Sequence, residues 1–354
     1  MVSVARLIQE MPNGYEEACY DKNAIQRKRG ISDPNDLLML SLFHLLNGCS
    51  LNEVSAIAKL TKLGNLSDVA FMKRFEKCND WFKWIISNIV TGGIITYDKP
   101  EWLKNYRVVA VDASDVTEKG RSNRIYRLHF AIDLFKMESL QYNITTNRTG
   151  ETLCNFTMTP NDLYIADRVY GTVNGIEHCL SGESNFILRL RKNSFKIYNN
   201  DNIPVILLNH LRLLKDGEVL NLNAYIQGSN KRMIPIRVCA KRKTADAIIR
   251  TQKQIHRKES KKQFKTTDDT KDFNNYIILV TALPNEITSG QILELYRLRW
   301  QIELYFKRLK SIMNYGELPK RRSESVFAWL NGKIMIALLI EKILGKSDFS
   351  PQEK

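Results

Sequence analysis

Residues 291–310 read QILELYRLRWQIELYFKRLK, and this stretch decides the fold that we expect. Its apolar residues recur every three or four positions, which predicts one helix over Gln291–Lys310. Apolar side chains flank a polar stripe on both sides, so we expect the helix to be largely buried. At about 100° per residue, four polar residues fall within roughly 60° of one another: Tyr296, Arg299, Glu303 and Lys310.

Charged side chains on a buried helix face need a partner. Burying them is costly unless they meet a metal ion, a phosphate or each other. Glu303 lies between Arg299 and Lys310, which favours a site for metal-bound phosphate. The alternative is a surface helix with ordinary ion pairs, since Glu303 is four residues from both Arg299 and Lys307. The helix alone leaves both interpretations open.

The composition points to a polyanionic partner. The chain has 354 residues, enough for two or three domains, and its 53 Lys+Arg exceed its 38 Asp+Glu by 15. Such an excess most often serves nucleic acid, although charge alone cannot separate DNA from RNA. An anionic membrane surface is the competing partner. However, the apolar segment Val326–Leu344 contains charged residues and predicts a packed helix, not a membrane span.

Cysteine and histidine spacing argues against zinc and against a disulfide framework. The six cysteines and five histidines are scattered, with no C-x2-C pair and no H-E-x-x-H motif. Reduced thiols in an intracellular protein explain this pattern best. The first residues also lack the apolar run of a signal peptide. We therefore expect a cytoplasmic, bacterial-type protein.

Residues 1–98 predict a helical domain that binds DNA. Asp33 and Pro34 start one helix, Ser50 opens a second with a capping box, and Ser67 caps a third, basic helix to Cys78. Two short helices around a turn suit a helix-turn-helix-like module, and a plain helical bundle suits the pattern equally well. A boundary is expected at 91–93, where Thr-Gly-Gly occurs.

The rest of the chain predicts an α/β core, interrupted once. Strands followed by alternating strand and helix over residues 99–192 indicate a mixed sheet. Its strands are expected at 107–111, 125–133, 139–146, 163–166 and 186–190, with a helix at 171–180. Residues 193–284 predict a β-rich insertion, with strands at 197–198, 205–208, 218–226, 233–240 and 276–281 and a very basic segment at 241–271.

Two aspartates share one setting. Asp112 and Asp167 each follow an apolar strand, at the end where open α/β sheets place their sites. Either alone is more often a turn former. Asp115 is a rival for the first position, and we prefer Asp112 because it ends the strand directly. With Glu303 they make three carboxylates, which select Mg²⁺ or Mn²⁺. Two such ions about 4 Å apart can drive in-line phosphoryl transfer.

These residues resemble the DDE transposases, specifically the insertion sequence 4 family with its Y-x2-R-x3-E-x6-K signature. The four polar residues of the helix match it in register, and the resemblance covers about residues 30–312. The family's D-R-G-Y motif corresponds to Asp167-Arg168-Val169-Tyr170, with valine in place of glycine. Asp112-Ala113-Ser114 matches the first aspartate motif, and Leu128–Leu153 resembles the central strands and the TGETL-like turn after them.

The resemblance implies a fold and a domain order. The α/β core would be RNase H-like, with mixed sheet and flanking helices, and the insertion at 193–284 would separate the second aspartate from the glutamate. Residues 285–322 would return to the core with the helix that carries Glu303. Residues 323–354 would form a C-terminal helix that serves as a dimerisation surface or as part of the core.

The resemblance also implies an activity. The enzyme would cleave double-stranded DNA at transposon ends and join them to target DNA, as a homodimer in the DNA complex. Asp112, Asp167 and Glu303 would hold two Mg²⁺ ions, with Mn²⁺ as a substitute. The residues implied to position DNA are Tyr296, Arg299, Lys310, Arg168, Tyr170 and Lys307. Two alternatives stay open: a non-catalytic DNA-binding regulator derived from a transposase, and another RNase H-like nuclease.

Overall fold

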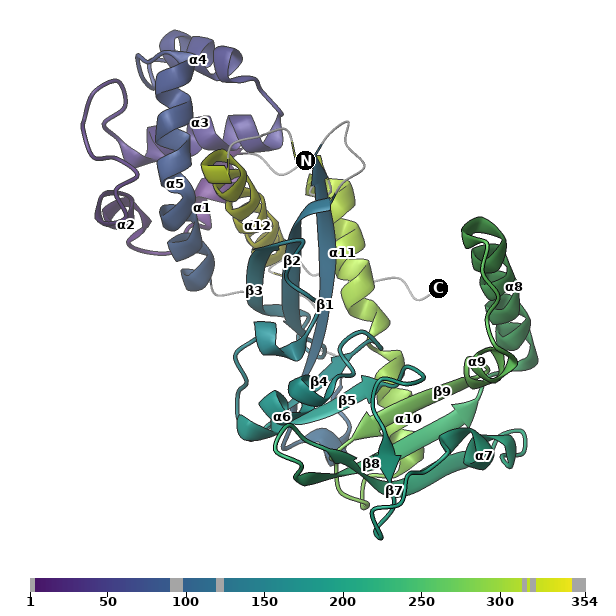
Figure 1. The fold of residues 1–354 in the computed structure, drawn as a ribbon. Coiled ribbons are helices and arrows are strands. Elements are labelled where there is room, and N and C mark those ends of the chain that lie inside the picture. The colour runs from purple at the N-terminus through teal and green to yellow at the C-terminus, as the bar shows by residue number, and fades with distance from the viewer. Residues whose placement is uncertain (1–3, 90–97, 119–123, 314–316, 319–322, 346–354) are drawn as a thin grey trace.

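The computed structural model describes residues 4–89, 98–118, 124–313, 317–318 and 323–345. Helices make up the N-terminal part, and a long mixed sheet with flanking helices makes up most of the rest (Figure 1). The architecture is therefore mixed α/β, as the sequence predicts.

Five helices form the N-terminal part: α1 (Val4–Gln9), α2 (Tyr15–Asp21), α3 (Pro34–Leu46), α4 (Leu51–Leu60) and α5 (Asp68–Asn88). The predicted caps are confirmed, because Asp33 accepts a hydrogen bond from the Asn35 amide and Ser50 forms its capping box. Helix α5 continues past its predicted end at Cys78, since the next turns keep an apolar face buried. The boundary expected at 91–93 lies outside the described residues.

One sheet runs through the rest of the chain, with strand order β3-β2-β1-β4-β5-β9-β8-β7-β6 and β10 beside β1. Strands β1, β4 and β5 are parallel, and the other main-path pairings are antiparallel. The strands are β1 (Arg107–Glu118), β2 (Arg124–Asp133), β3 (Glu138–Thr146), β4 (Asp162–Ala166), β5 (Asn185–Arg189), β6 (Ile197–Tyr198), β7 (Val219–Gln227), β8 (Met233–Arg242), β9 (Tyr276–Thr281) and β10 (Glu317–Leu318). Short 3₁₀ turns occur at η1 (Glu101–Leu103) and η2 (Leu153–Asn155), and α6 (Val173–Ser181) links β4 to β5.

The strands of residues 193–284 extend the same sheet. Strand β9 pairs with β5, with Ile187 opposite Thr281, so β6–β9 continue the sheet beyond β5. The strand predicted at 205–208 is wrong. Residues Leu207–Arg212 form helix α7 instead, because Leu207, Leu208 and Leu211 bury one face at helical spacing. The basic segment contains α8 (Ala245–Lys262) and α9 (Asp268–Phe273), and α8 stands away from the sheet (Figure 1).

The C-terminal helix α12 (Ser323–Gly345) returns to the N-terminal helices and packs along α5. Asn331 donates to Asn79 on α5 at 2.8 Å, and Ser325 donates to Glu76 at 2.6 Å. Most of α12 is buried within the chain. None of the helices in the described residues combines the length and hydrophobicity that crossing a bilayer requires.

Two apolar cores lie on opposite faces of the sheet. The first includes Val108 and Ala110 of β1 together with buried residues of the N-terminal helices, α10 (Ser289–Arg297), α11 (Trp300–Met313) and α12. The second includes Val109 and Val111 with residues of α6 and β7–β9. Alternate residues of β1 therefore face different cores, and this alternation decides what each polar residue of the strand can meet.

Candidate active site

Strand register brings Asp112 and Asp167 side by side. Ala110 of β1 is paired with Ile165 of parallel β4. Two positions further on are Asp112, which is still in β1, and Asp167, which directly follows the end of β4. Side chains alternate along a strand, so both aspartates lie on the face that packs against α10 and α11. The predicted meeting of these two residues at one edge of the sheet is therefore supported by the register.

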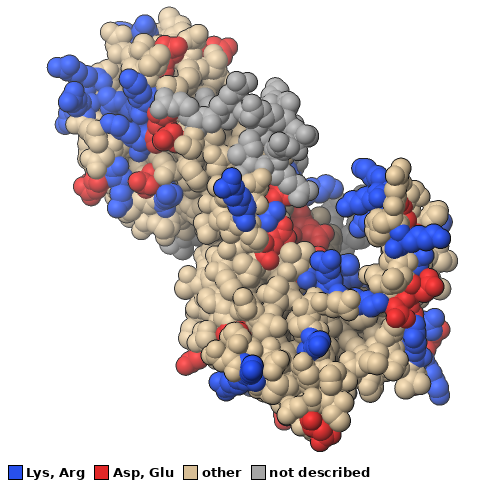
Figure 2. Space-filling model, in the orientation of Figure 1, with Lys and Arg blue, Asp and Glu red and all other residues tan. Residues whose placement is uncertain are grey.

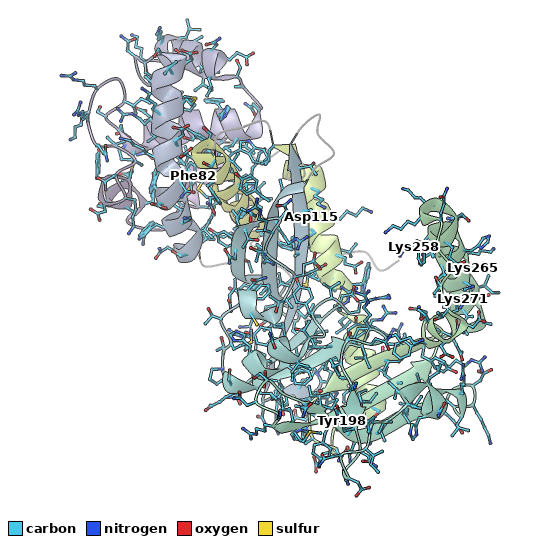
Figure 3. The ribbon with its side chains drawn as sticks, viewed as in Figure 1. Phe82, Asp115, Tyr198, Lys258, Lys265 and Lys271 are labelled. Atoms are coloured by element: carbon cyan, nitrogen blue, oxygen red, sulfur yellow. The ribbon has the colours of Figure 1, made fainter. Side chains whose placement is uncertain are left out.

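The reason given for preferring Asp112 was wrong. Asp112 does not end its strand, because β1 continues to Glu118 alongside β2, with Asp112 opposite Phe130. Asp115 is an odd number of positions away and faces the other core. There it accepts a hydrogen bond from Arg127 at 2.9 Å (Asp115 is labelled in Figure 3). The direction of the side chain, not the strand end, separates Asp112 from its rival.

The single helix predicted over Gln291–Lys310 is also wrong. Helix α10 ends at Arg297 and α11 begins at Trp300. The amides of Leu298 and Arg299 bond to carbonyls three residues back, which tightens the chain into a turn between the helices. The sequence has neither glycine nor proline here, so composition does not signal the break.

Glu303 is exposed, contrary to the expected burial. Its side chain is 55 % exposed, and it accepts a hydrogen bond from the Arg299 guanidinium, which is 13 % exposed. That guanidinium also lies over the Tyr296 ring, 5.8 Å from the centroid. The Arg299–Glu303 ion pair expected for a surface helix is thus present.

Electrostatic coupling links these residues. Burial raises the pKa of Asp112 to about 6, Arg299 opposes this rise, and Glu303 and Glu151 add to it. The Ala113 amide, which donates to the Asp112 carboxylate at 2.9 Å, also opposes it. Because Glu303 acts on Asp112 and the Asp167 charge acts on Arg299, the three carboxylates share one electrostatic environment.

The remaining predicted residues lie at different depths. Arg168 is 41 % exposed, with its Nε 4.0 Å from Oδ1 of Asp167. Lys307 and Lys310 are exposed on α11. Tyr170 is fully buried, and burial, together with the charges of Asp112 and Glu151, raises the pKa of its hydroxyl. Tyr170 therefore lies beneath the site and not on its surface.

Sequence reasoning missed Glu151 and Arg127 as parts of the site. Arg127 lies 3.6 Å from Glu151, donates to Asp115 and to the Thr149 carbonyl, and so ties the loop 149–151 to β1. The Thr-Gly-Glu-Thr-Leu segment that contains Glu151 entered the sequence analysis only through the resemblance. The alternation of side chains along β2, which puts Arg127 on the same face as Asp115, could have predicted the role of Arg127.

The donor set suits a divalent cation. Among the described residues, no three histidine, cysteine, aspartate or glutamate side chains gather closely enough to hold a metal ion. Oδ1 of Asp167 is nevertheless buried without a hydrogen-bond partner, and Asp112 and Glu303 repel each other. A hard cation would relieve both, since carboxylate oxygens are its preferred ligands. The three residues would fit such an ion if the Glu303 carboxylate left the Arg299 guanidinium and bound the ion instead.

Comparison with known families decides the interpretation of this geometry. The transposase DDE domain matches residues 103–339, which include both aspartates and Glu303. The chain belongs to the transposase DDE domain family. It is accordingly a transposase, an enzyme that acts on DNA, and membership implies use of a divalent metal.

Two relatives from Escherichia coli match nearly the whole chain, and a third relative matches part of it. The chain is 28 % identical over 348 residues to the InsL protein for insertion sequence element IS186A of Escherichia coli strain K12, covering 96 % of this chain and 93 % of InsL. It is 28 % identical over 349 residues to the transposase for IS421 of Escherichia coli, with the same coverage. The transposase for IS231C of Bacillus thuringiensis subsp. berliner is 26 % identical over 240 residues, 62 % of this chain and 50 % of that protein.

Proposed function

We propose that this transposase moves an insertion sequence by cut-and-paste transposition, cleaving at the transposon ends and transferring the strands into target DNA. The observation that carries the proposal is the strand register that aligns Asp112 with Asp167 beneath the helix bearing Glu303. Three carboxylates that share one electrostatic environment on a basic protein suit phosphoryl transfer on DNA.

The residues divide into two groups by chemistry. Asp112, Asp167 and Glu303 would hold two Mg²⁺ ions, with Mn²⁺ as a substitute, which when bound activate the attacking hydroxyl and stabilise the leaving oxygen. Arg299, which donates to Glu303 in the absence of DNA, would contact a phosphate next to the scissile one in the DNA complex, since guanidinium groups bind phosphate well.

Other residues would position the DNA. Half-buried Arg168 and exposed Lys307 and Lys310 are cations around the site and would contact backbone phosphates. Tyr296 would orient Arg299 by lying under its guanidinium. The DNA contact assigned to Tyr170 remains a prediction. Its buried position favours support of the Asp167 loop.

The finer assignments belong to the same proposal. The sheet order and the helix signature support an RNase H-like core of the insertion sequence 4 group, with residues 193–284 as an insertion that lengthens the sheet. Residues 1–98 would bind the terminal inverted repeats, and two copies would act together on paired ends. The enzyme would work in the cytoplasm at the nucleoid.

The test compares wild type with Glu303→Gln on supercoiled plasmid in Mn²⁺, with nicking as the measurement. Wild type is expected to nick the plasmid, and Glu303→Gln is expected to bind DNA normally without nicking it, because the amide keeps the shape of the side chain but loses its charge. Glu286→Gln, the same change at an exposed glutamate of the loop before α10, serves as the matched control and should nick like wild type. Equal nicking by Glu303→Gln would refute the site.

A further inference from the structure

A second polar site lies beside the carboxylates. A pocket of about 280 Å³ opens where β5 ends, between the loop after β4 and helix α9. Four cationic side chains line it: Arg168, Arg189, Arg191 and Lys192. Arg168 follows Asp167 directly, so the pocket begins at the edge of the candidate active site.

The positive charge in this pocket is only partly neutralised. Arg168 lies 4.0 Å from Asp167, and Lys192 lies 3.9 Å from Asp269. In the part of the chain that the structure describes, Arg189 and Arg191 form no ion pair within 4.0 Å. Four cations thus share two carboxylates, one of which belongs to the catalytic set.

The cations are close enough to repel one another. Burial, followed by the charge of Arg189, lowers the pKa of Arg168. Burial, followed by the charges of Arg189 and Arg168, lowers the pKa of Lys243 to about 8. Lys243 lies at the base of α8, where its Nζ donates to Thr251 at 3.0 Å. Crowded cations that lack anionic partners are costly, and a bound anion would relieve that cost.

Helix α8 continues this positive surface away from the site. It has no buried residue, and its partly covered face, which includes Ile248, Ile255 and Glu259, packs toward the returning chain. At about 100° per residue, the opposite face carries a basic stripe: Arg250, Lys253, Arg257 and Lys261.

Figure 2 shows acidic side chains near the base of α11, then a group of blue side chains, then the blue surface of α8 across a hollow. In Figure 3, Lys258 lies on the side of α8 toward α11.

We infer that the pocket of Arg168, Arg189, Arg191 and Lys192 binds a backbone phosphate of the DNA strand that runs from the active site toward α8. The inference rests on the proposed function. Guanidinium groups donate in pairs to phosphate oxygens, and two of the four side chains are free of carboxylates to do so. The basic stripe of α8 then contacts the same DNA further along, so the strand is held on one side of the scissile phosphate.

The test measures DNA binding as a function of salt. Fluorescence anisotropy with a labelled 40-base-pair duplex follows wild type and the double variant Arg189→Gln/Arg191→Gln between 50 and 200 mM salt. Each phosphate contact contributes about 0.9 to the slope of log Kobs against log salt, so the double variant should lose up to about 1.8 if each arginine contributes one contact. Arg191→Lys keeps the charge and should keep most of the slope.

The control is Arg232→Gln, which removes one positive charge, as Arg191→Gln does, from the exposed turn between β7 and β8 and should leave the slope close to that of wild type. An unchanged slope in the double variant would refute phosphate binding in the pocket. A loss of slope in Arg232→Gln equal to that in Arg191→Gln would refute it as well. The single variant Arg191→Gln, at an exposed residue, should lower the slope by about 0.9. This variant tests the inference if the double variant fails to fold. Metal-dependent nicking by wild type alongside an unchanged slope would reject the pocket and leave the proposed function standing. Absence of both binding and nicking would reject the function itself.

Discussion

Lys333 offers a sharp test of how the C-terminal helix is held. Its side chain is 6 % exposed, its Nζ donates to the Leu45 carbonyl in the last turn of α3, and it lies 5.2 Å from the centre of the Trp329 ring. Burial lowers the pKa of Lys333 from 10.5 to about 8. Replacing it by methionine keeps an unbranched apolar chain of nearly the same length and removes the buried charge.

The magnitude follows from the pKa change. A depression of this size means that the charged form costs about 3 kcal/mol of stability at pH 7, at 1.36 kcal/mol per unit. Lys333→Met removes that cost but leaves the Leu45 carbonyl without its donor, a loss of about 1 kcal/mol. The variant should therefore be more stable than wild type at pH 7 by roughly 2 kcal/mol.

The sign of the effect reverses with pH. Between pH 8 and 10.5 the unfolded chain binds more protons at Lys333 than the folded chain, so wild-type stability rises with pH in that window. Above pH 10.5, wild type should be more stable than Lys333→Met by about 1 kcal/mol, since the two proteins then differ only in the hydrogen bond to the Leu45 carbonyl. Urea unfolding at pH 7 and pH 11 measures the difference in stability on both sides of the window. A difference that is independent of pH, or a destabilised variant at pH 7, would refute the reasoning.

Three further outcomes are expected. Gly332→Ala should destabilise the protein by about 1–2 kcal/mol in urea unfolding, because its Cβ would stand 2.5 Å from Leu45 Cδ1, and increased stability would contradict the packing. Arg237→Met should lower the free energy of unfolding by about 2–4 kcal/mol, since buried Arg237 donates to the carbonyls of Leu283 at 3.1 Å and Ile287 at 3.0 Å. A loss below about 1 kcal/mol would show that the loop before α10 keeps its structure without these hydrogen bonds. Mg²⁺ at ten times its Kd should stabilise wild type by about 1.4 kcal/mol and leave Asp112→Asn unchanged in thermal unfolding, and an equal rise in both would place the ion elsewhere.

Local patterns predicted much of this fold. Alternation along residues 125–133 and 139–146 predicted β2 and β3 closely, and side-chain chemistry predicted the caps at Asp33 and Ser50. The strand before Asp167 was also predicted correctly. These elements depend on interactions between residues near in sequence, which a single chain displays directly.

The misses depend on partners distant in sequence. Strand β1 extends to Glu118 because β2 continues beside it, and no local signal tells a strand that its neighbour is longer. The break near Arg299 follows from tightened hydrogen bonds without glycine or proline. The ion pair of Arg127 with Glu151 joins a strand to a loop, so its role in shaping the candidate site could be recognised only once both were placed.

The packing of α12 on α5 also sets an order of events during synthesis. At 5–20 residues per second, the 235 positions between Asn88 and Ser323 take roughly 10–50 s to translate, so the N-terminal helices leave the ribosome long before their partner exists. Until then the apolar side chains that α12 covers, Phe82 and Leu45 among them, stay open to water or to a chaperone. The core of the first five helices is thus completed last. A ribosome that stops before α12 releases a protein whose N-terminal helices lack a closed core.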